Sequence, residues 1–357
     1  MQIKVKAKEL LEVLNKIKHI AKPDKFCPVL SNGMFETTDS GIRITVANLI
    51  STAVVNTAAE IIESGKCLID LCKLSAILAT LSGDVTIEEK DAVIWIKKDK
   101  TKCKLEKTKL SDYPQDLYKL NNPDAEFMIT AASLREGIKK TEKFSEKSSN
   151  ILSGINIKTD GNLVKFSACD GNRLAYIIKC CESSDIFVDI TIPEASANSL
   201  LPFLPNDGDV NIKVSAALCE FEFDDIRFCT RLLEGVFPKI EQLLPKSHTT
   251  KLSVNKDELK NVLERIEVVE TKADKCAVMF TVKGAFMTVE ASEYKCNDVL
   301  TLEEKEGEDI SFKLNRCFLQ AVLSSISGTF VKFELTGPRS PVLFPDMEDK
   351  FLIMPIA

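Results

Sequence analysis

Hydrophobic and polar positions follow the same order three times along the chain. An alternating strand pattern at residues 3–5 precedes an amphipathic helix pattern, and the same order returns at residues 127–138 and 252–263. The equivalent leucines Leu10, Leu134 and Leu259 are 124 and 125 residues apart. A period of this length corresponds to a whole domain and not to a solenoid unit.

Each repeat predicts two helices separated by short strands. The first helices are expected at 8–20, 133–144 and 256–268, and the second at about 71–82, 193–204 and 315–327. Alternating strands are expected between them at 41–46, 163–166 and 285–289, and after the second helix at 85–87, 210–212 and 331–333. A glycine follows each second helix, at Gly83, Gly208 and Gly328, where a left-handed residue just past the helix is expected.

These elements predict an α+β protein of three domains, 1–122, 123–247 and 248–357. In each domain, two helices pack on antiparallel sheets that must bury one face. The connections at 121–124 and 245–249 are short and polar. Such short linkers predict fixed angles between the domains.

Composition excludes several classes of protein. Hydrophobic residues make up 45% and charged residues 28% of the chain, as in soluble globular proteins. No apolar run approaches the roughly 20 residues that span a bilayer, and the first residues form a strand pattern and no signal peptide. Twelve cysteines without a Cys-x-x-Cys pair, and only two histidines, predict reduced thiols in a cytoplasmic protein with no metal and no cofactor.

The sequence contains no recognised catalytic arrangement. Phosphate-binding loops, dinucleotide-binding glycines, zinc-protease motifs and nucleophile elbows are all missing. Adjacent carboxylates such as Glu88 and Glu89 are typical of solvated strand ends. A thiol nucleophile stays open as an alternative, because no local environment distinguishes one cysteine from the others.

Three motifs carry a resemblance to a known family. Residues 168–175 read Ala-Cys-Asp-Gly-Asn-Arg-Leu-Ala, residues 231–245 read Arg-Leu-Leu-Glu-Gly-Val-Phe-Pro-Lys-Ile-Glu-Gln-Leu-Leu-Pro, and the chain closes with Leu-Ile-Met-Pro-Ile-Ala. Asp-Gly is also a common hairpin turn, and the last segment also suits an edge strand. Together with the threefold repeat, the three motifs closely resemble the bacterial β sliding clamps, over the whole chain.

The resemblance implies a non-catalytic processivity factor of DNA replication. In that family two three-domain protomers join head to tail into a six-domain ring around duplex DNA, with helices lining the hole and sheets outside. Clients such as the replicative polymerase of the DNA polymerase III type, the clamp loader and repair proteins insert a short hydrophobic peptide into a groove between the second and third domains. No membrane partner is implied.

The net charge of −6 argues against a DNA-binding protein until its distribution is considered. The six helix windows sum to +4, which leaves −10 for the remainder and suits a mildly positive lumen. Lysine and arginine also favour solvent-facing helix positions in general, so the charge alone does not decide. The expected DNA-facing residues are Lys8, Lys16, Lys73, Arg135, Lys139, Lys140, Lys143, Lys260 and Arg316.

We name the positions that match the family's peptide groove the partner site. They are Leu152, Cys169, Gly171, Asn172, Arg173, Leu174, Pro238, Gln242, Leu243, Phe318, Leu352, Met354 and Ile356. Asn172 and Gln242 stand where the family often has histidine and arginine, which weakens the expected preference for acidic peptides. Phe318 stands where a tyrosine is common and removes one hydrogen bond.

The joint of the ring is expected between a basic and an acidic edge. Alternation over residues 97–109 places four lysines on one strand face, and the third repeat supplies glutamates and two exposed valines. Lysines that guard an edge strand against aggregation are the alternative explanation. The expected joint residues are Lys98, Lys100, Lys102, Cys103, Lys104, Val268, Val269, Glu303, Glu304 and Glu306.

Two other functions remain open from the sequence. A repeat scaffold that binds peptides without encircling DNA would assemble but would not be retained on a DNA circle. An enzyme with an unrecognised cysteine nucleophile would lose activity on alkylation. The combined motifs and the threefold repeat favour the sliding clamp.

Overall fold

Six helices and twenty-five strands make up the part of the chain that the computed structural model describes, which is residues 1–357 except 22–24, 26, 92, 115–117, 183–186, 270–275, 292–295 and 357. The chain divides into two compact units. The first unit comprises residues 1–135, 181–188 and 195–233, and the second comprises 136–180, 189–194 and 234–357.

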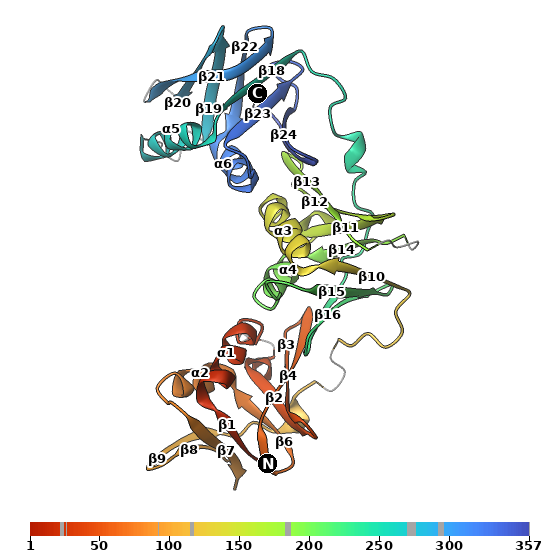
Figure 1. Cartoon of the computed structure of the whole chain (residues 1–357), viewed down its shortest axis with the longest axis vertical. Helices are drawn as coiled ribbons and strands as arrows, with labels where there is room; N and C mark the ends of the chain where they lie inside the picture. Colours follow the sequence, from red (N-terminus) through yellow and green to blue (C-terminus); the bar gives the residue numbers. More distant parts are fainter. Residues whose placement is uncertain are drawn as a thin grey trace. The chain divides into compact units, whose positions relative to one another are not determined.

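The first unit contains two antiparallel sheets. A five-stranded sheet has the order β5 (Glu60–Glu63), β1 (Gln2–Lys6), β7 (Asp84–Lys90), β8 (Val93–Lys98) and β9 (Thr101–Glu106). An eight-stranded sheet has the order β10 (Ala125–Thr130), β15 (Asp209–Val214), β16 (Leu218–Phe223), β17 (Ile226–Arg231), β4 (Ser51–Thr57), β3 (Gly41–Ala47), β2 (Asn32–Thr38) and β6 (Lys66–Asp70). Helices α1 (Ala7–Ile17) and α2 (Leu71–Leu78) pack against each other (Figure 1).

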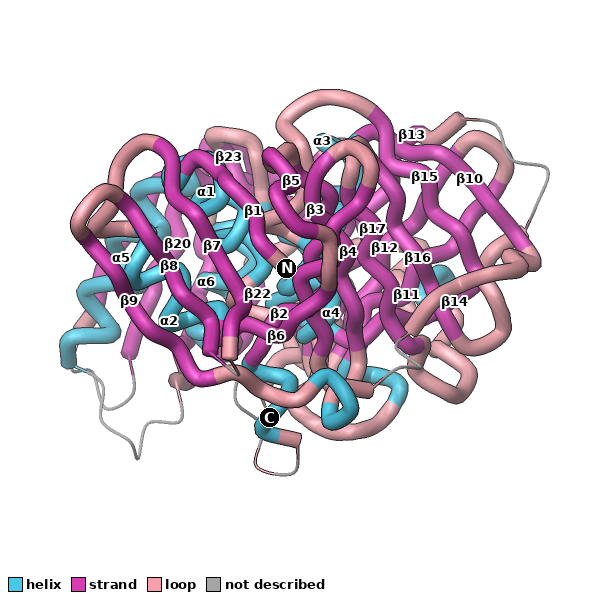
Figure 2. Tube along the Cα trace, turned by 90° about the horizontal axis from the view of Figure 1, so that it is seen from below, coloured by secondary structure: helices cyan, strands magenta, loops and turns pink. Residues whose placement is uncertain are grey.

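The second unit contains a twelve-stranded sheet. It runs β14 (Asp189–Pro193), β11 (Gly154–Asp160), β12 (Leu163–Cys169), β13 (Arg173–Cys180), β25 (Asp349–Ile353), β24 (Val342–Asp346), β23 (Phe330–Leu335), β18 (Thr250–Asn255), β21 (Asn297–Gly307), β20 (Phe286–Ala291), β19 (Ala277–Lys283) and β22 (Ile310–Asn315). Helices α5 (Lys256–Val269) and α6 (Arg316–Ser325) pack side by side (Figure 1). The remaining helices are α3 (Ala131–Thr141), which continues into a 3-10 turn at Glu142–Phe144, and α4 (Glu194–Leu200). Figure 2 distinguishes the strands from the helices along the whole trace.

Helical periodicity explains which faces are buried. In α5 the buried residues are Leu259, Val262, Leu263 and Ile266, which recur at the spacing of one helix face. The helix α6 begins at a side-chain cap, because the Asn315 side chain accepts hydrogen bonds from the backbone N–H groups of Cys317 and Phe318. All six predicted helices are present, with ends that differ by a few residues.

The threefold repeat appears in one recurring backbone contact. The first residue of each leading helix, Ala7, Ala131 or Lys256, donates its N–H at 2.9 Å to a carbonyl in the turn after the second helix of the same repeat. The acceptors are Gly83, Gly208 and Thr329. The repeats are therefore similar in structure as well as in sequence.

The expected role of the glycines after the second helices is wrong. The helices end at Leu78, Leu200 and Ser325, several residues before Gly83 and Gly208 and three before Gly328. Gly83 and Gly208 do have positive φ angles, of 74° and 101°, but they shape the turn into the next strand.

Two strand pairs join different repeats. In the first unit β4 pairs with β17, and in the second unit β13 pairs with β25. Each pairing carries a sheet from one predicted domain into the next, so backbone hydrogen bonds join neighbouring repeats. No described helix has the length and apolar character needed to cross a bilayer.

Candidate partner-binding site and neighbouring surfaces

The turn between β12 and β13 organises the backbone of the partner site. Both carboxylate oxygens of Asp170 are used: Oδ1 accepts the N–H groups of Asn172 and Arg173, each at 3.0 Å, and Oδ2 accepts Nε of Arg173 at 2.8 Å. Gly171 lies between them with a φ of 84°, which glycine adopts without strain. The Asp-Gly motif therefore is a hairpin turn, and it also fixes Arg173.

An apolar cluster lies on one face of β13 beside this turn. It combines side chains from β12, β13, β25 and the segment after β17. Its buried members are Cys169, Leu174, Tyr176, Phe237, Ile240 and Leu352, and the half-buried Ile151, Leu152, Ile178 and Leu244 pack against it. The structure thus brings Leu152, Cys169, Leu174 and Leu352 of the partner site together.

Arg173 faces a different set of side chains from those of Leu174. Its guanidinium carbon lies 4.6 Å from the centre of the Phe318 ring and 5.6 Å from that of Phe144. Contacts of this kind hold a cation over aromatic rings. Successive residues of a strand point to opposite faces, so Arg173 lies with Phe318 and Phe144, while Leu174 faces the apolar cluster.

Two backbone hydrogen bonds hold the C-terminal segment in place. The N–H of Met354 donates to the carbonyl of Asn172 at 2.7 Å, and that of Ile356 donates to the carbonyl of Lys313 at 2.8 Å. The Met354 side chain remains 38% exposed. An adaptable thioether is therefore available to a ligand beside the apolar cluster.

The segment 237–244 divides between the apolar cluster and the surface. Pro238, Gln242 and Leu243 are exposed, with Leu243 at 52%, while Phe237 and Ile240 are buried in the cluster. The 3-10 turn at Ile240–Gln242 directs these apolar residues inward. Leu243 is available at the surface and does not form the floor of the site.

Sequence reasoning missed Tyr176, Phe237 and Ile240. The alternation of β13 signals Tyr176, because it lies two residues after Leu174 on the same face. Its hydroxyl donates to Oε1 of Glu241 at 3.0 Å, and burial together with Glu241 raises the pKa of Tyr176 to about 12. The tyrosine is therefore neutral at physiological pH and anchors the turn at residues 240–242.

The buried thiols do not suit nucleophilic chemistry. Burial, with the charge of Asp170, raises the pKa of Cys169 to about 11, and burial raises the pKa of Cys67 and of Cys229 to about 12. A protonated thiol is a poor nucleophile. The described residues also contain no group of three or more potential metal ligands.

Six of the nine expected DNA-facing residues are exposed on or next to helices. They are Lys8, Lys16, Lys73, Lys139, Lys143 and Lys260. Arg135 is half-buried and donates to the carbonyls of Leu204 and Pro205, at 2.6 and 3.2 Å. Its guanidinium is therefore committed to its own unit.

The prediction is wrong for Lys140 and Arg316, which are 8% and 5% exposed. The Lys140 ammonium lies 2.7 Å from Asp349 and 2.9 Å from Glu136. Arg316 lies 2.8 Å from Glu267. Both cations sit on expected helices but face acidic partners inside the second unit, which the helix pattern alone does not reveal.

The basic edge expected at the joint is a hairpin and not one strand. Residues 99–100 form the turn between β8 and β9, where Lys97 pairs with Lys102 and Trp95 with Lys104. Lys102 and Lys104 therefore share a face, whereas Lys98 lies on the other face with Cys103 and Lys100 lies in the turn. The expectation of four lysines on one face is wrong for Lys98 and Lys100.

The acidic side of the expected joint has an open strand edge. Residues 297–301 of β21 pair with β20, while Leu302 and residues 304–307 pair with β18. Glu303 lies at a register shift within the β18 pairing. The N–H of Leu302 donates to the carbonyl of Ala285. After Leu302, the edge of β21 that faces away from β18 pairs with no strand in the described part of the chain. Val268 and Val269, at the end of α5, are 84% and 37% exposed.

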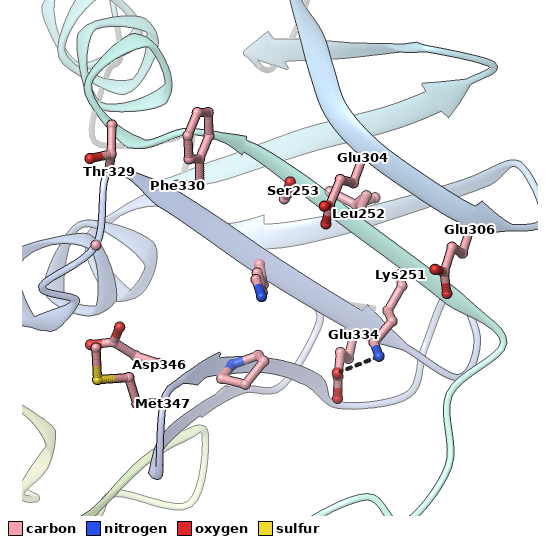
Figure 3. A pocket seen from close by; sticks show the side chains of 13 residues that line it. Lys251, Leu252, Ser253, Glu304, Glu306, Thr329, Phe330, Glu334, Asp346 and Met347 are labelled. Carbon is pink, nitrogen blue, oxygen red and sulfur yellow. Dashed lines mark ion pairs between the residues drawn. The ribbon is translucent and has the colours of Figure 1, made fainter.

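A hollow of about 590 Å³ is lined by residues of β18, β21, β23 and the turn after β24. Figure 3 shows Glu304, Glu306, Phe330 and Met347 around it, with an ion pair between Lys251 and Glu334 at 3.5 Å. It shares no residue with the partner site, and the sequence did not predict it. Glu304 and Glu306 line it as well as belonging to the expected joint.

Comparisons with known proteins agree with the threefold repeat. Three family models match consecutive parts of the chain: the N-terminal domain of the DNA polymerase III beta subunit at residues 1–118, the central domain at 128–239 and the C-terminal domain at 241–356. The beta sliding clamp of Haemophilus influenzae is 23% identical over 369 residues, covering 100% of both chains. That of Treponema pallidum is 22% identical over 373 residues, covering 100% of this chain and 99% of the relative.

Solved structures show the same fold. The DNA polymerase sliding clamp of Bacillus subtilis superposes with a TM-score of 0.92 at 20% identity, covering 100% of this chain and 99% of that one. A Pseudomonas aeruginosa sliding clamp bound to griselimycin gives the same values. With three clamp domains matched in order along its length, the chain belongs to the family of bacterial DNA polymerase III beta subunits, the non-catalytic sliding clamps that confer processivity in DNA replication.

Proposed function

We propose that two copies of this chain close head to tail around duplex DNA in the cytoplasm, and that the partner site receives hydrophobic peptides of the polymerase, the clamp loader and repair proteins. The domain limits we propose are 1–122, 123–247 and 248–357. The observation that carries the proposal is the apolar cluster of Cys169, Leu174, Tyr176 and Leu352 beside a fixed arginine.

The chemistry of the cluster suits a peptide with two or three apolar side chains. Aliphatic and aromatic residues supply contact area, and the half-exposed Met354 adapts to different ligands. Arg173 is held by Asp170 and by the Phe318 ring, so its remaining N–H groups are positioned for peptide carbonyls. Asn172 and Gln242 contribute hydrogen bonds without charge, which weakens the preference for acidic peptides.

DNA retention in this proposal depends on topology more than on contact. The exposed helix lysines Lys8, Lys16, Lys139 and Lys260 give a weak sequence-independent attraction to phosphates. Few firm phosphate contacts suit a ring that must slide. Opening of the ring, and not release of a charge contact, then limits dissociation from circular DNA.

The ring joint in this proposal adds one strand to another. Among the described strands β9 lies at a sheet edge and carries Lys102 and Lys104, and the partly unpaired β21 carries Glu304 and Glu306. Opposite charges on two unpaired edges favour a heterologous contact, which closes into a ring when the rotation allows it. Val268 and Val269 supply apolar area to the same joint.

The partner site is tested by titrating griselimycin, which the related Pseudomonas aeruginosa clamp binds, into the full-length protein. The variants Leu243→Asp and Met354→Asp each place a charge on an exposed apolar position, and we expect each to weaken binding at least 10-fold. Met347→Asp is the matched control, because Met347 is 96% exposed in the same unit and lies outside the partner site. Equal affinity for all three variants and the original protein would remove the partner site from this surface.

A further inference from the structure

Two of the twelve cysteines contact each other in the third repeat. The sulfur atoms of Cys276 and Cys317 lie 3.3 Å apart, and Cys317 is exposed while Cys276 is partly exposed. Neither residue belongs to the partner site, to the expected joint or to the set of expected DNA-facing residues. The family's non-catalytic role makes no use of a thiol pair, so this contact requires a separate explanation.

Backbone hydrogen bonds hold Cys276 and Cys317 in place. Cys276 directly precedes β19, whose first residue pairs with Asn315 of β22, and the N–H of Arg316 donates to the carbonyl of Cys276 at 2.7 Å. Cys317 is in the first turn of α6, and its own N–H is bound by the Asn315 side chain at 2.9 Å. Cys276 has a φ of 57°, an uncommon conformation for a side chain other than glycine, asparagine or aspartate.

We propose that Cys276 and Cys317 form a reversible disulfide when the protein meets a hydroperoxide such as hydrogen peroxide. The exposed Cys317 thiol releases its proton, and the thiolate attacks peroxide: an S–O bond forms, the O–O bond breaks, and a sulfenic acid and hydroxide result. The hydroxide takes up the released proton and becomes the first water. The Cys276 thiol then attacks this sulfur: the S–S bond forms, the S–O bond breaks, and hydroxide leaves with the thiol proton as a second water. Two thiols are oxidised and one peroxide is reduced, and a dithiol restores the pair.

The disulfide would join α6 to Cys276, the residue directly before β19. Arg316 already connects α6 to α5, because its guanidinium lies 2.8 Å from Glu267 near the end of α5. A covalent link between residues 276 and 317 closes a loop of about 40 residues, which restricts the unfolded chain more than the folded one. Oxidation therefore stabilises the third repeat, and this role is independent of the proposed partner site.

The first repeat supplies a matched cysteine for comparison. Cys72 is exposed and is the second residue of α2, after the capping residue Asp70, just as Cys317 is the second residue of α6 after the cap Asn315. The described residues place no thiol in hydrogen-bond contact with Cys72. Peroxide at Cys72 should thus give a sulfenic acid or a higher acid without an internal disulfide.

The test is non-reducing peptide mapping by mass spectrometry of the full-length protein after hydrogen peroxide treatment. We expect a linked peptide pair containing Cys276 and Cys317, its loss on dithiothreitol treatment, and a Tm about 5–10 °C higher in the oxidised form. The linkage and the shift should persist in Cys72→Ser and disappear in Cys317→Ser. Cys317→Ser changes one exposed sulfur to oxygen, so its folding is checked by its Tm under reducing conditions.

Three results would overturn the proposal. The first is oxidation of Cys317 to a sulfinic or sulfonic acid in the original protein with no linked pair. The second is a linked pair without any rise in Tm, which would remove the stabilising role. The third is an equal rise in Tm for Cys317→Ser. None of these results depends on griselimycin binding or on ring formation, so they leave the proposed function to its own test.

Discussion

Replacing Lys140 by methionine should destabilise the protein and leave DNA attraction nearly unchanged. Lys140 is buried, and its ammonium lies between Asp349 at 2.7 Å, Glu136 at 2.9 Å and Asp346 at 3.7 Å. A second cation, Lys179, contacts Glu136 at 2.9 Å and Asp349 at 3.7 Å. Without Lys140, the carboxylates of Glu136, Asp346 and Asp349 have only the Lys179 ammonium nearby, and it contacts Glu136 closely and Asp349 at a longer distance.

The magnitude follows from the burial of the remaining charges. Removing one partner of a buried ion pair costs about 3–5 kcal/mol, because the other charge stays desolvated without compensation. In a folding unit of this size that cost corresponds to a fall in Tm on the order of 10 °C. Asp349 also accepts the N–H of Ile178 at 3.1 Å, so its carboxylate cannot turn to solvent without losing a backbone contact on β13.

The neighbouring Lys139 supplies the control, because it is exposed on the same helix. We expect Lys139→Met to change stability by at most about 0.5 kcal/mol and to weaken DNA attraction slightly. Thermal unfolding followed by circular dichroism measures the first effect, and the salt dependence of DNA binding measures the second. Equal Tm values for both variants, or weaker DNA binding by Lys140→Met at unchanged Tm, would refute the buried role.

The pH dependence adds a sign to this prediction. Burial acts to raise the pKa of Glu136, but the hydrogen bonds from Lys140 and Lys179 lower it below its ordinary value of 4.5. A carboxyl group whose pKa is lower in the folded than in the unfolded protein stabilises the fold at pH values above the unfolded pKa. This stabilisation is lost as the pH falls through the folded pKa. The difference in Tm between the original protein and Lys140→Met should therefore shrink below about pH 4.5.

Two further substitutions test packing and assembly. Gly137→Ala should destabilise the protein by about 1–2 kcal/mol, because the added Cβ would lie 2.5 Å from the Phe166 ring. In a helix with free space the same change would stabilise by up to about 1 kcal/mol. Urea unfolding measures the sign of the change in stability, and a stabilised variant would contradict the contact. Val268→Asp should convert a dimer into monomers, as measured by light scattering at micromolar protein concentration. The control is Val236→Asp, at a valine of similar exposure, which should leave the dimer intact. A Val268→Asp protein that is still dimeric would show that this valine is not part of the joint.

Local patterns predicted the helices well, because each buried face repeats at helical spacing within a few turns of chain. The residues of α5 that the pattern marked as apolar, such as Leu259 and Val262, are the ones that the structure buries. The Asp-Gly turn was similarly evident from its own residues. Both features depend on neighbours in sequence, which is the information that a single chain contains.

Features that depend on distant partners were not predictable in the same way. The pairing of β13 with β25 joins residues about 175 positions apart, and only this pairing brings Asp349 to Lys140. The lysine-rich segment 97–104 was predicted as one strand because alternation continues through the turn at Asp99, whose φ of 47° lies in the left-handed region. The apolar floor at Phe237 and Ile240 depends on a 3-10 turn that has no periodic signal.

The central claim is that two chains close into a ring that DNA can leave only by sliding off an end. The most direct measurement loads the purified protein with a clamp loader onto nicked circular DNA and follows its retention after linearisation at 0.5 M salt, a concentration of about this order being enough to screen phosphate contacts. A dimeric ring predicts long retention on the circle and rapid loss from the linear DNA. Equal loss from both forms, or a monomer at every concentration in light scattering, would contradict encirclement.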